Sequence, residues 1–216
     1  VFHSPAAGVL HALVANHVVQ GRVIFPGAGC LEVARAAAGK TLGGVFFLQP
    51  LVVEAPNLLV ECAVADGRFE VRSGADGVLE DATVHCTGAL AADEAWQLID
   101  HAWERASSRA TDVGALYDAF STAELQYGPG FRMLAHAWSG TRCVARLTRR
   151  TDWQGTHVHP ADLDGALQLG AIASRGDSET RLPFAVDVAA LGRVPAPAMW
   201  ATVAQRSAEA SLVNMA

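Results

Sequence analysis

Residues 26–39 read PGAGCLEVARAAAG, and residues 160–174 read PADLDGALQLGAIAS. Both stretches begin with proline, which suits the first turn of a helix, and both are rich in alanine and glycine. Small or apolar residues fall on most faces of each stretch, which is typical of a buried helix. The likeness between them suggests two similar units, each built round one central helix, although two alanine-rich helices can also resemble each other by chance.

The segments around these helices have the β-branched and aromatic content of strands. The predicted strands are 44–53, 58–65, 67–73, 82–90, 130–138, 142–149, 182–191, 199–205 and 210–214. Asp66-Gly67 provides a two-residue hairpin turn. The charged segment 92–112 has no strand periodicity and separates two strand-rich parts, so we expect a domain boundary there.

Composition narrows the class of protein. The 216 residues include 16 Lys and Arg and 22 Asp and Glu, for a net charge of −6, and 51% of the residues are hydrophobic. This content excludes a disordered chain, and the acidic balance argues against nucleic-acid binding. No apolar run is long enough to span a membrane, and the first residues lack the features of a signal peptide, so we expect a cytoplasmic protein. The four cysteines are far apart and are expected to be buried small hydrophobes, not disulfide or zinc ligands: Cys30, Cys62, Cys86 and Cys143.

Four short segments combine polar residues with glycine and proline. The first, HVVQGRVIFP at 17–26, runs directly into Gly27-Ala28-Gly29 at the start of the first helix. The others are YGPGF at 127–131, HPADLDGALQ at 159–168 and LPF at 182–184. In the third segment Asp164 and Gln168 are one helical turn apart, so we expect both side chains on one face.

Taken in this order, the four segments resemble the signature of the dehydratase domain of modular polyketide synthases: HxxxGxxxxP, YGPxF, HPxxxDxxxQ/H and LPF. The resemblance implies an α+β double hotdog fold, in which two antiparallel sheets are each wrapped round a central buried helix. It divides the chain into an N-terminal hotdog at 1–95 that carries the catalytic histidine, a linker at 96–111, and a C-terminal hotdog at 112–216 that carries the catalytic aspartate. The active site is expected between the two units.

The resemblance also implies roles for individual residues. His17 matches the catalytic base, Asp164 the catalytic acid, Gln168 the residue that orients the acid, and Tyr127 a tyrosine near the substrate hydroxyl. Further positions that match the motifs are expected to help position the substrate: Gly21, Pro26, Gly27, Gly29, Pro129 and Phe131. Family substrates are β-hydroxyacyl thioesters on the phosphopantetheine arm of an acyl carrier protein, which lose water to give α,β-unsaturated thioesters. The resemblance therefore implies an acyl carrier protein and neighbouring synthase domains as partners and no metal or organic cofactor, and it is compatible with a homodimer.

The residue types suit this reaction. A neutral imidazole, with a pKa of about 6.5, can remove the α-proton. A carboxyl group can protonate the departing hydroxyl if burial raises its pKa. Free N–H groups of Gly27, Ala28 and Gly29 at a helix N-terminus suit the charge that develops on the thioester oxygen, and the glycines would allow a close approach. Gly21 has either a similar role or the simpler one of permitting a bend, and the division of proton transfer between His17 and Asp164 stays open.

Other interpretations compete with this one. Asp162 and Asp164 also fit as ordinary acids in the first turns of a helix, and LPF fits as a strand start. His157 and His159, two apart on an expected strand, are short of a third metal ligand, and the remaining histidines are expected to be structural. The chain is shorter than a typical domain of this kind, and its usual HPLLG-like opening is not evident. Alternative functions are a product template domain, which is an aldol cyclase with a His and Asp pair, and a non-catalytic thioester-binding scaffold.

Overall fold

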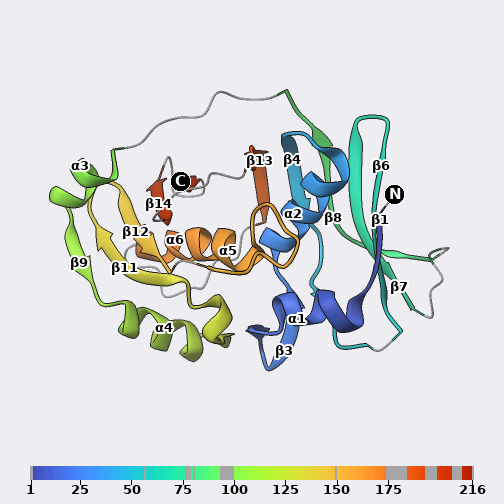
Figure 1. The fold of residues 1–216 in the computed structure, drawn as a ribbon, viewed down its shortest axis with the longest axis horizontal. Helices are drawn as coiled ribbons and strands as arrows, with labels where there is room; N and C mark the ends of the chain where they lie inside the picture. The colour runs from blue at the N-terminus through green and yellow to red at the C-terminus, as the bar shows by residue number, and fades with distance from the viewer. Residues whose placement is uncertain are drawn as a thin grey trace.

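A computed structural model describes residues 2–55, 57–75, 79, 81–92, 100–148, 150–173, 184–192, 199–205 and 211–215. Within these residues the strands form two large antiparallel sheets and one smaller sheet. The two halves of the chain lie side by side, and the helices at their centres, α2 (Gly27–Ala38) and α5 (Pro160–Gln168), contact each other in the middle of the molecule (Figure 1). This arrangement agrees with the predicted α+β fold of two sheets, each wrapped round a buried helix.

The first large sheet has six strands in the order β1-β6-β7-β8-β4-β13. Their bounds are Phe2–Pro5, Leu59–Ala65, Arg68–Gly74, Thr83–Leu90, Leu42–Phe47 and Ala185–Ala189. Helix α2 packs on this sheet with its small and apolar residues buried, and it ends at Gly39, whose left-handed φ of 66° closes the last turn. The last strand, β13, comes from the C-terminal half and pairs with β4, so this sheet draws strands from both parts of the chain.

The second large sheet has five strands in the order β15-β14-β12-β11-β9. Their bounds are Ser211–Met215, Met199–Gln205, Cys143–Leu147, Leu134–Ser139 and Arg109–Thr111. Helix α5 and the short α6 (Gly170–Ala173) lie against it. The segment 96–111 contributes α3 (His101–Ala106) and β9, and β9 pairs with β11.

The small sheet joins the two halves and positions the site. It has four strands in the order β10-β2-β3-β5, with bounds Leu125–Tyr127, His17–Val19, Arg22–Phe25 and Leu51–Val52. The pairing of β10 with β2 sets Tyr127 opposite His17, so two motifs that are far apart in the sequence become neighbours. Helix α1 (His11–Val14) precedes β2, and α4 (Val113–Thr122) precedes β10 with Asp112 as its N-terminal cap.

Two of the nine predicted strands differ from the structure by more than their end residues. The expected strand 44–53 is two strands, β4 and β5, which belong to different sheets because the chain turns at residues 48–50, where Pro50 has no amide hydrogen to donate. The expected strand 130–138 begins only at Leu134, since residues 129–131 form a 3₁₀ turn, η3 (Pro129–Phe131). All four cysteines are buried and none forms a disulfide, as expected.

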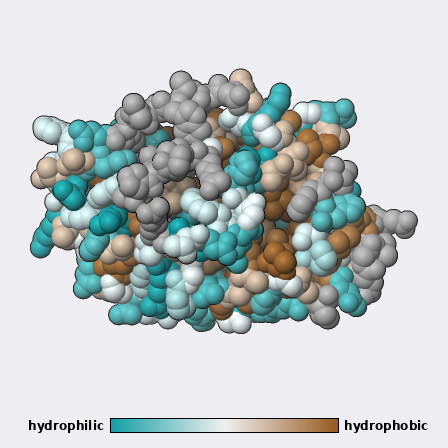
Figure 2. Space-filling view, viewed as in Figure 1, coloured by the Kyte–Doolittle hydropathy of each residue, from teal (hydrophilic) through white to brown (hydrophobic). Residues whose placement is uncertain are grey.

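On the face shown in Figure 2, most of the apolar residues that reach the surface lie on the N-terminal half, around α1 and the strands β4 and β6, and smaller apolar patches lie on the C-terminal half. Among the described residues, no helix combines the length and the apolar character that a membrane span requires.

Candidate active site

His17 lies at the start of β2 with its side chain held by the neighbouring strand. Its Nδ1 is 2.8 Å from the carbonyl oxygen of Ile24 on β3. A carbonyl can only accept a hydrogen bond, so Nδ1 carries the hydrogen in the neutral ring and Nε2 has a free lone pair. The residue is only 8% exposed. The backbone of β3 thus fixes the tautomer in which Nε2 can act as a base.

Asp164 faces His17 from helix α5. Its Oδ1 is 3.9 Å from His17 Nε2, and the residue is 7% exposed. Burial raises the pKa of the Asp164 carboxyl above its usual value, and the nearby His17 and the hydrogen bond from Gln168 oppose this shift only in part. Burial therefore shifts the Asp164 carboxyl toward its protonated form, opposite the nitrogen that bears the lone pair in the neutral His17 ring.

Gln168 lies one turn after Asp164 and contacts it, which confirms the predicted shared face. Its Nε2 donates to Asp164 Oδ2 at 2.8 Å and to the Phe131 carbonyl at 3.1 Å. Gln168 therefore links the helix that carries the acid to the YGPGF segment.

The YGPGF segment forms an aromatic wall beside His17. The ring centroids of Tyr127 and Phe131 are 5.6 and 5.3 Å from that of His17. Burial, and next the proximity of Asp164, raises the pKa of the Tyr127 hydroxyl, so it stays protonated. The turn is clamped onto Asn16: Gly128 N donates to the Asn16 carbonyl at 2.8 Å, and a Cβ at Gly128 would lie 2.2 Å from Asn16 Oδ1. Any larger residue at this position would have to displace the Asn16 side chain.

The glycines near the first helix have local structural roles. Gly21 has a φ of 73° in the turn between β2 and β3, and its amide donates to Gln126 Oε1 at 2.9 Å, which fits the simpler expectation of a bend. A Cβ at Gly29 would lie 2.8 Å from the ring of Phe25, and one at Gly27 would lie 3.0 Å from the ring of Phe47. These glycines let aromatic rings pack against the start of α2.

The first amides of α2 differ in their availability. The amide of Gly29 donates to the Pro26 carbonyl at 2.9 Å, so it is already used within the turn. The amides of Gly27 and Ala28 precede the first intrahelical donor position, where helix amides have no carbonyl of their own helix to bind. Of the three amides expected to stabilise an oxyanion, these two remain suited to the role.

Three residues beside the site were not predicted from sequence. Tyr117 on α4 donates from its hydroxyl to Gln168 Oε1 at 3.0 Å. Arg150 donates to Asp162 Oδ1 at 3.1 Å and to the Gly130 carbonyl at 3.3 Å. Asn16 holds the YGPGF turn. The sequence does contain a signal for Tyr117. After the cap residue Asp112, apolar residues recur at helical spacing, and Tyr117 is the residue in that series that carries a hydroxyl. Residues 113–122 were not predicted to form a helix, so this signal was missed.

The histidines at 157 and 159 lie in a loop before α5 and not on a strand, so the expectation of a strand there is wrong. His159 caps α5: its Nδ1 accepts from the Ala161 amide at 3.1 Å. Burial and next the charge of Arg150 lower its pKa to about 4. The His157 amide donates to the buried Glu32 of α2 at 2.7 Å. Within the described ranges, no group of three His, Cys, Asp or Glu side chains is arranged to hold a metal ion.

Asp162 is more than a solvated acid of the first helical turn. It is fully buried and pairs with Arg150. Of the LPF segment, residues 182 and 183 lie outside the described residues. Phe184 is 69% exposed, and its ring centroid is 6.2 Å from that of Phe46.

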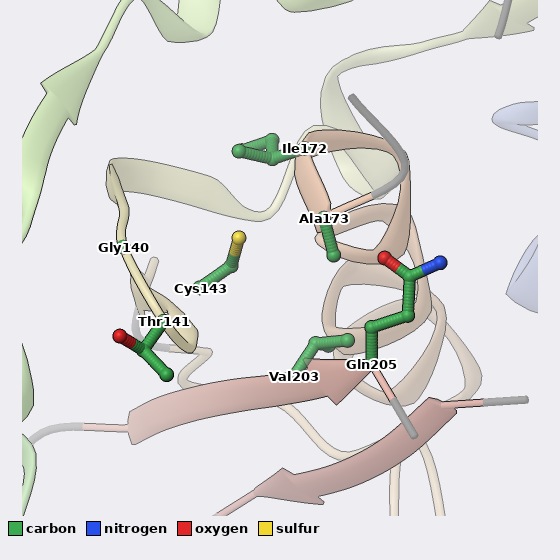
Figure 3. A pocket seen from close by; sticks show the side chains of 7 residues that line it. All are labelled: Gly140, Thr141, Cys143, Ile172, Ala173, Val203 and Gln205. Atoms are coloured by element: carbon green, nitrogen blue, oxygen red, sulfur yellow. The ribbon is translucent and has the colours of Figure 1, made fainter. Parts of the chain in front are cut away.

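A cavity of about 170 Å³ lies further along the C-terminal helices. It is bordered by β12, β14 and α6, with the Cys143 sulfur directed toward α6 (Figure 3). Its lining residues are Gly140, Thr141, Cys143, Ile172, Ala173, Val203 and Gln205. Ile172 and Ala173 follow Asp164 by roughly two helical turns, so this cavity is separate from the His17 and Asp164 pair.

Comparisons with known proteins agree on one family. A family model described as "Polyketide synthase dehydratase N-terminal domain" matches residues 100–213, and one described as "Polyketide synthase dehydratase domain" matches residues 1–77. The chain is 32% identical over 229 residues to polyketide synthase ThaG of Burkholderia thailandensis, and this match covers 92% of the chain and 4% of ThaG. It spans between 3% and 10% of the length of the curated relatives that it matches.

Solved structures give the same result for the fold. The dehydratase domain from the CurF module of curacin polyketide synthase matches with a TM-score of 0.82 and 21% identity, covering 99% of this chain and 84% of that one. A dehydratase structure of the borrelidin and fluvirucin polyketide synthases matches with a TM-score of 0.78 and 28% identity, covering 99% and 81%. The predicted double hotdog fold is confirmed.

Proposed function

The chain belongs to the polyketide synthase dehydratase family, and we propose that it removes water from a β-hydroxyacyl thioester with His17 as base and Asp164 as acid. One observation carries this assignment: His17 Nε2, the nitrogen that bears the lone pair in the neutral ring because Nδ1 donates to a carbonyl, faces Asp164 Oδ1 at 3.9 Å. An elimination requires a basic nitrogen for the α-proton and a protonated carboxyl for the departing hydroxyl, and burial shifts Asp164 toward that protonated form.

In the proposed reaction His17 Nε2 takes the proton from the α-carbon. The electron pair of that C–H bond forms the double bond between the α- and β-carbons, and the C–O bond at the β-carbon breaks. Asp164 gives its proton to the departing hydroxyl, which leaves as water. The proton on the His17 imidazolium then returns to the Asp164 carboxylate, so the enzyme is restored without a net change in protonation.

The charge that develops on the thioester oxygen needs a donor. The amides of Gly27 and Ala28 are suited to this role because the helix itself leaves them unbonded. Pro26 and Gly29 shape the turn that presents these amides, and Gly21 shapes the hairpin that carries His17. Pro129 and Phe131 would hold a wall for the substrate to pack against, and Tyr127, whose ring centroid lies 5.6 Å from that of His17, would contact the substrate hydroxyl.

The proposed substrate arrives on the phosphopantetheine arm of an acyl carrier protein. The chain would work beside the neighbouring domains of a synthase and in a homodimer. It would consist of two hotdog units, at 1–95 and 112–216, joined by a linker at 96–111. Acid–base elimination by two side chains requires no metal or organic cofactor.

A turnover assay tests the proposal. The chain is incubated with 3-hydroxyacyl thioesters of several chain lengths and both hydroxyl configurations, carried on acyl carrier protein or a pantetheine mimic, and mass spectrometry follows the loss of one water. We expect turnover by the parent chain and a loss of about 100-fold or more in His17→Ala and in Asp164→Asn. The matched controls are His136→Ala and Asp187→Asn, which change exposed residues of the same types on β11 and β13 and should keep full activity. A folded parent chain with no turnover on any of these substrates would sink the dehydratase assignment, and active variants would remove the two residues from it.

A further inference from the structure

A series of hydrogen bonds leads from Tyr117 through Gln168 to Asp164. The backbone amide of Leu134 donates to the Tyr117 hydroxyl oxygen at 3.2 Å, and that hydroxyl donates to Gln168 Oε1 at 3.0 Å. The amide nitrogen of Gln168 then donates to the Phe131 carbonyl at 3.1 Å and to Asp164 Oδ2 at 2.8 Å. Each link in this chain is buried, and Tyr117 itself is 6% exposed.

The direction of every link is fixed by two backbone groups that cannot exchange roles. The Leu134 N–H can only donate, so the tyrosine hydroxyl oxygen accepts at this link. The Phe131 carbonyl can only accept, so the group next to it must be the NH₂ of Gln168. A flipped amide would set its oxygen against the Phe131 carbonyl. Gln168 Oε1 therefore faces the tyrosine hydroxyl, and because an amide oxygen can only accept, that hydroxyl donates its hydrogen to Oε1.

The end of the chain determines the state of the carboxyl group. Because Gln168 donates to Asp164 Oδ2, this oxygen must accept, and a proton on the carboxyl group belongs on Oδ1. That oxygen is the one 3.9 Å from His17 Nε2. We propose that Tyr117 is a positioning residue that, through Gln168, keeps the acid proton of Asp164 on Oδ1, the oxygen that faces the reacting substrate. This inference rests on the proposed role of Asp164 as the acid.

The hydroxyl of Tyr117 is suited to this role at any working pH. Burial raises its pKa to about 12, so it remains a donor. Its ring is held on one side by the Arg132 guanidinium, 5.3 Å from the ring centroid, and on another by Phe120 at 6.0 Å. A side chain packed in this way cannot turn its hydroxyl elsewhere, and so it can hold the orientation of a neighbour.

Tyr117→Phe removes the hydroxyl and keeps the ring. We expect kcat to fall about 10-fold, the effect of one neutral hydrogen bond, and KM to stay within about 2-fold because the substrate contacts are unchanged. The matched control is Thr202→Val, which removes another buried hydroxyl of the C-terminal half, one with no hydrogen-bond partner among the described residues. This variant should keep the parent kcat.

A double variant and a spectroscopic measurement separate positioning from general damage. If Tyr117 acts through Gln168, Tyr117→Phe adds nothing to the loss in Gln168→Met, and the double variant has the kcat of Gln168→Met alone. The carboxylic C=O stretch of Asp164, identified as the infrared band that Asp164→Asn removes, should move to higher wavenumber in Tyr117→Phe as the bond from Gln168 weakens. 3,5-Difluorotyrosine at 117, a stronger donor of nearly the same shape, should move the band the other way even if the phenylalanine variant does not fold.

The outcomes distinguish this proposal from the dehydratase assignment. The infrared measurement needs no turnover. A parent chain that is inactive on every thioester would overturn the dehydratase assignment, and the position of the Asp164 band would still test the role of Tyr117. An Asp164 band at the parent position in both Tyr117 variants, or a multiplicative loss of kcat in the double variant, overturns the role of Tyr117.

Discussion

Arg150 and Asp162 form an ion pair behind the site, and removing one member tests how the YGPGF turn is held. Arg150 Nε donates to Asp162 Oδ1 at 3.1 Å, and its Nη2 donates to the Gly130 carbonyl at 3.3 Å. Asp162 is fully buried, and its Oδ2 has no hydrogen-bond partner within the described part of the chain. Burial raises the pKa of Asp162, and the Arg150 guanidinium opposes that shift. The guanidinium is therefore the group that offsets the burial of this carboxylate.

Arg150→Met leaves the carboxylate buried without its charge partner. Such a loss costs about 3–5 kcal/mol of unfolding free energy, or a fall in Tm of roughly 6–20 °C for a chain of this size. Asp162→Leu should cost less, about 1–3 kcal/mol, because the Arg150 side chain is 17% exposed and keeps the Gly130 carbonyl. The double variant should lie within about 1 kcal/mol of the parent, since an apolar pair can replace a buried ion pair.

Urea unfolding at pH 7, followed by circular dichroism, measures all three variants. Arg142→Met is the matched control, because Arg142 pairs with Glu104 at 3.3 Å nearer the surface and its removal should cost at most about 1 kcal/mol. Turnover of Arg150→Met should also fall, since the Gly130 turn carries the aromatic wall beside His17. The reasoning is refuted if Arg150→Met costs no more than Arg142→Met, or if the double variant is as unstable as the sum of the two single variants.

Three further changes have signs that the structure determines. Asp164→Asn should be inactive but more stable than the parent at pH 7. Burial raises the pKa of this carboxyl in the folded chain, so the parent loses stability as the pH rises above the pKa of the same carboxyl in the unfolded chain. The stability gained by the variant should therefore shrink toward pH 4, and a constant gain would contradict this. Gly128→Ala should lower both Tm and turnover, at a cost of about 1–3 kcal/mol in unfolding free energy, because the added Cβ would lie 2.2 Å from Asn16 Oδ1. Gly170→Ala, whose Cβ would meet no atom within 4 Å, should change neither Tm nor turnover. His159 has a folded pKa of about 4 against an ordinary 6.5, so the parent should lose stability as pH falls from 6.5 to 4, and an equally steep loss in His159→Asn would refute this role.

Features with a local signature were predictable from the sequence. The starts of α2 and α5 follow from proline before runs of small residues, and most strands follow from β-branched and aromatic content. The contact of Asp164 with Gln168 follows from their spacing within one helix, which no tertiary arrangement alters. Each of these features depends on residues within a few positions of one another.

Features that depend on distant pairing had no such signature. Leu51 and Val52 look like the continuation of β4, but they pair with β3 in the small sheet instead. The register that sets Tyr127 opposite His17 joins residues more than a hundred positions apart, and side-chain periodicity does not encode a partner. Asp162 fits the sequence as an ordinary acid of the first helical turn, because its partner, Arg150, lies in a loop whose path the sequence does not reveal.

The two members of the proposed acid–base pair need different surroundings, and different halves of the chain supply them. A carboxyl group keeps its proton near neutral pH only if it is withdrawn from water, and α5 provides this on its buried face. A neutral imidazole presents its lone pair at Nε2 if a fixed acceptor binds the N–H at Nδ1, and the carbonyl of Ile24 on β3 provides this acceptor. Helix α5 cannot supply the surroundings that His17 needs, and β3 cannot supply those that Asp164 needs. The pairing of β10 with β2, which brings the two halves together, is therefore as necessary to the proposed chemistry as either side chain. A change that loosens this pairing should abolish turnover while leaving His17 and Asp164 intact.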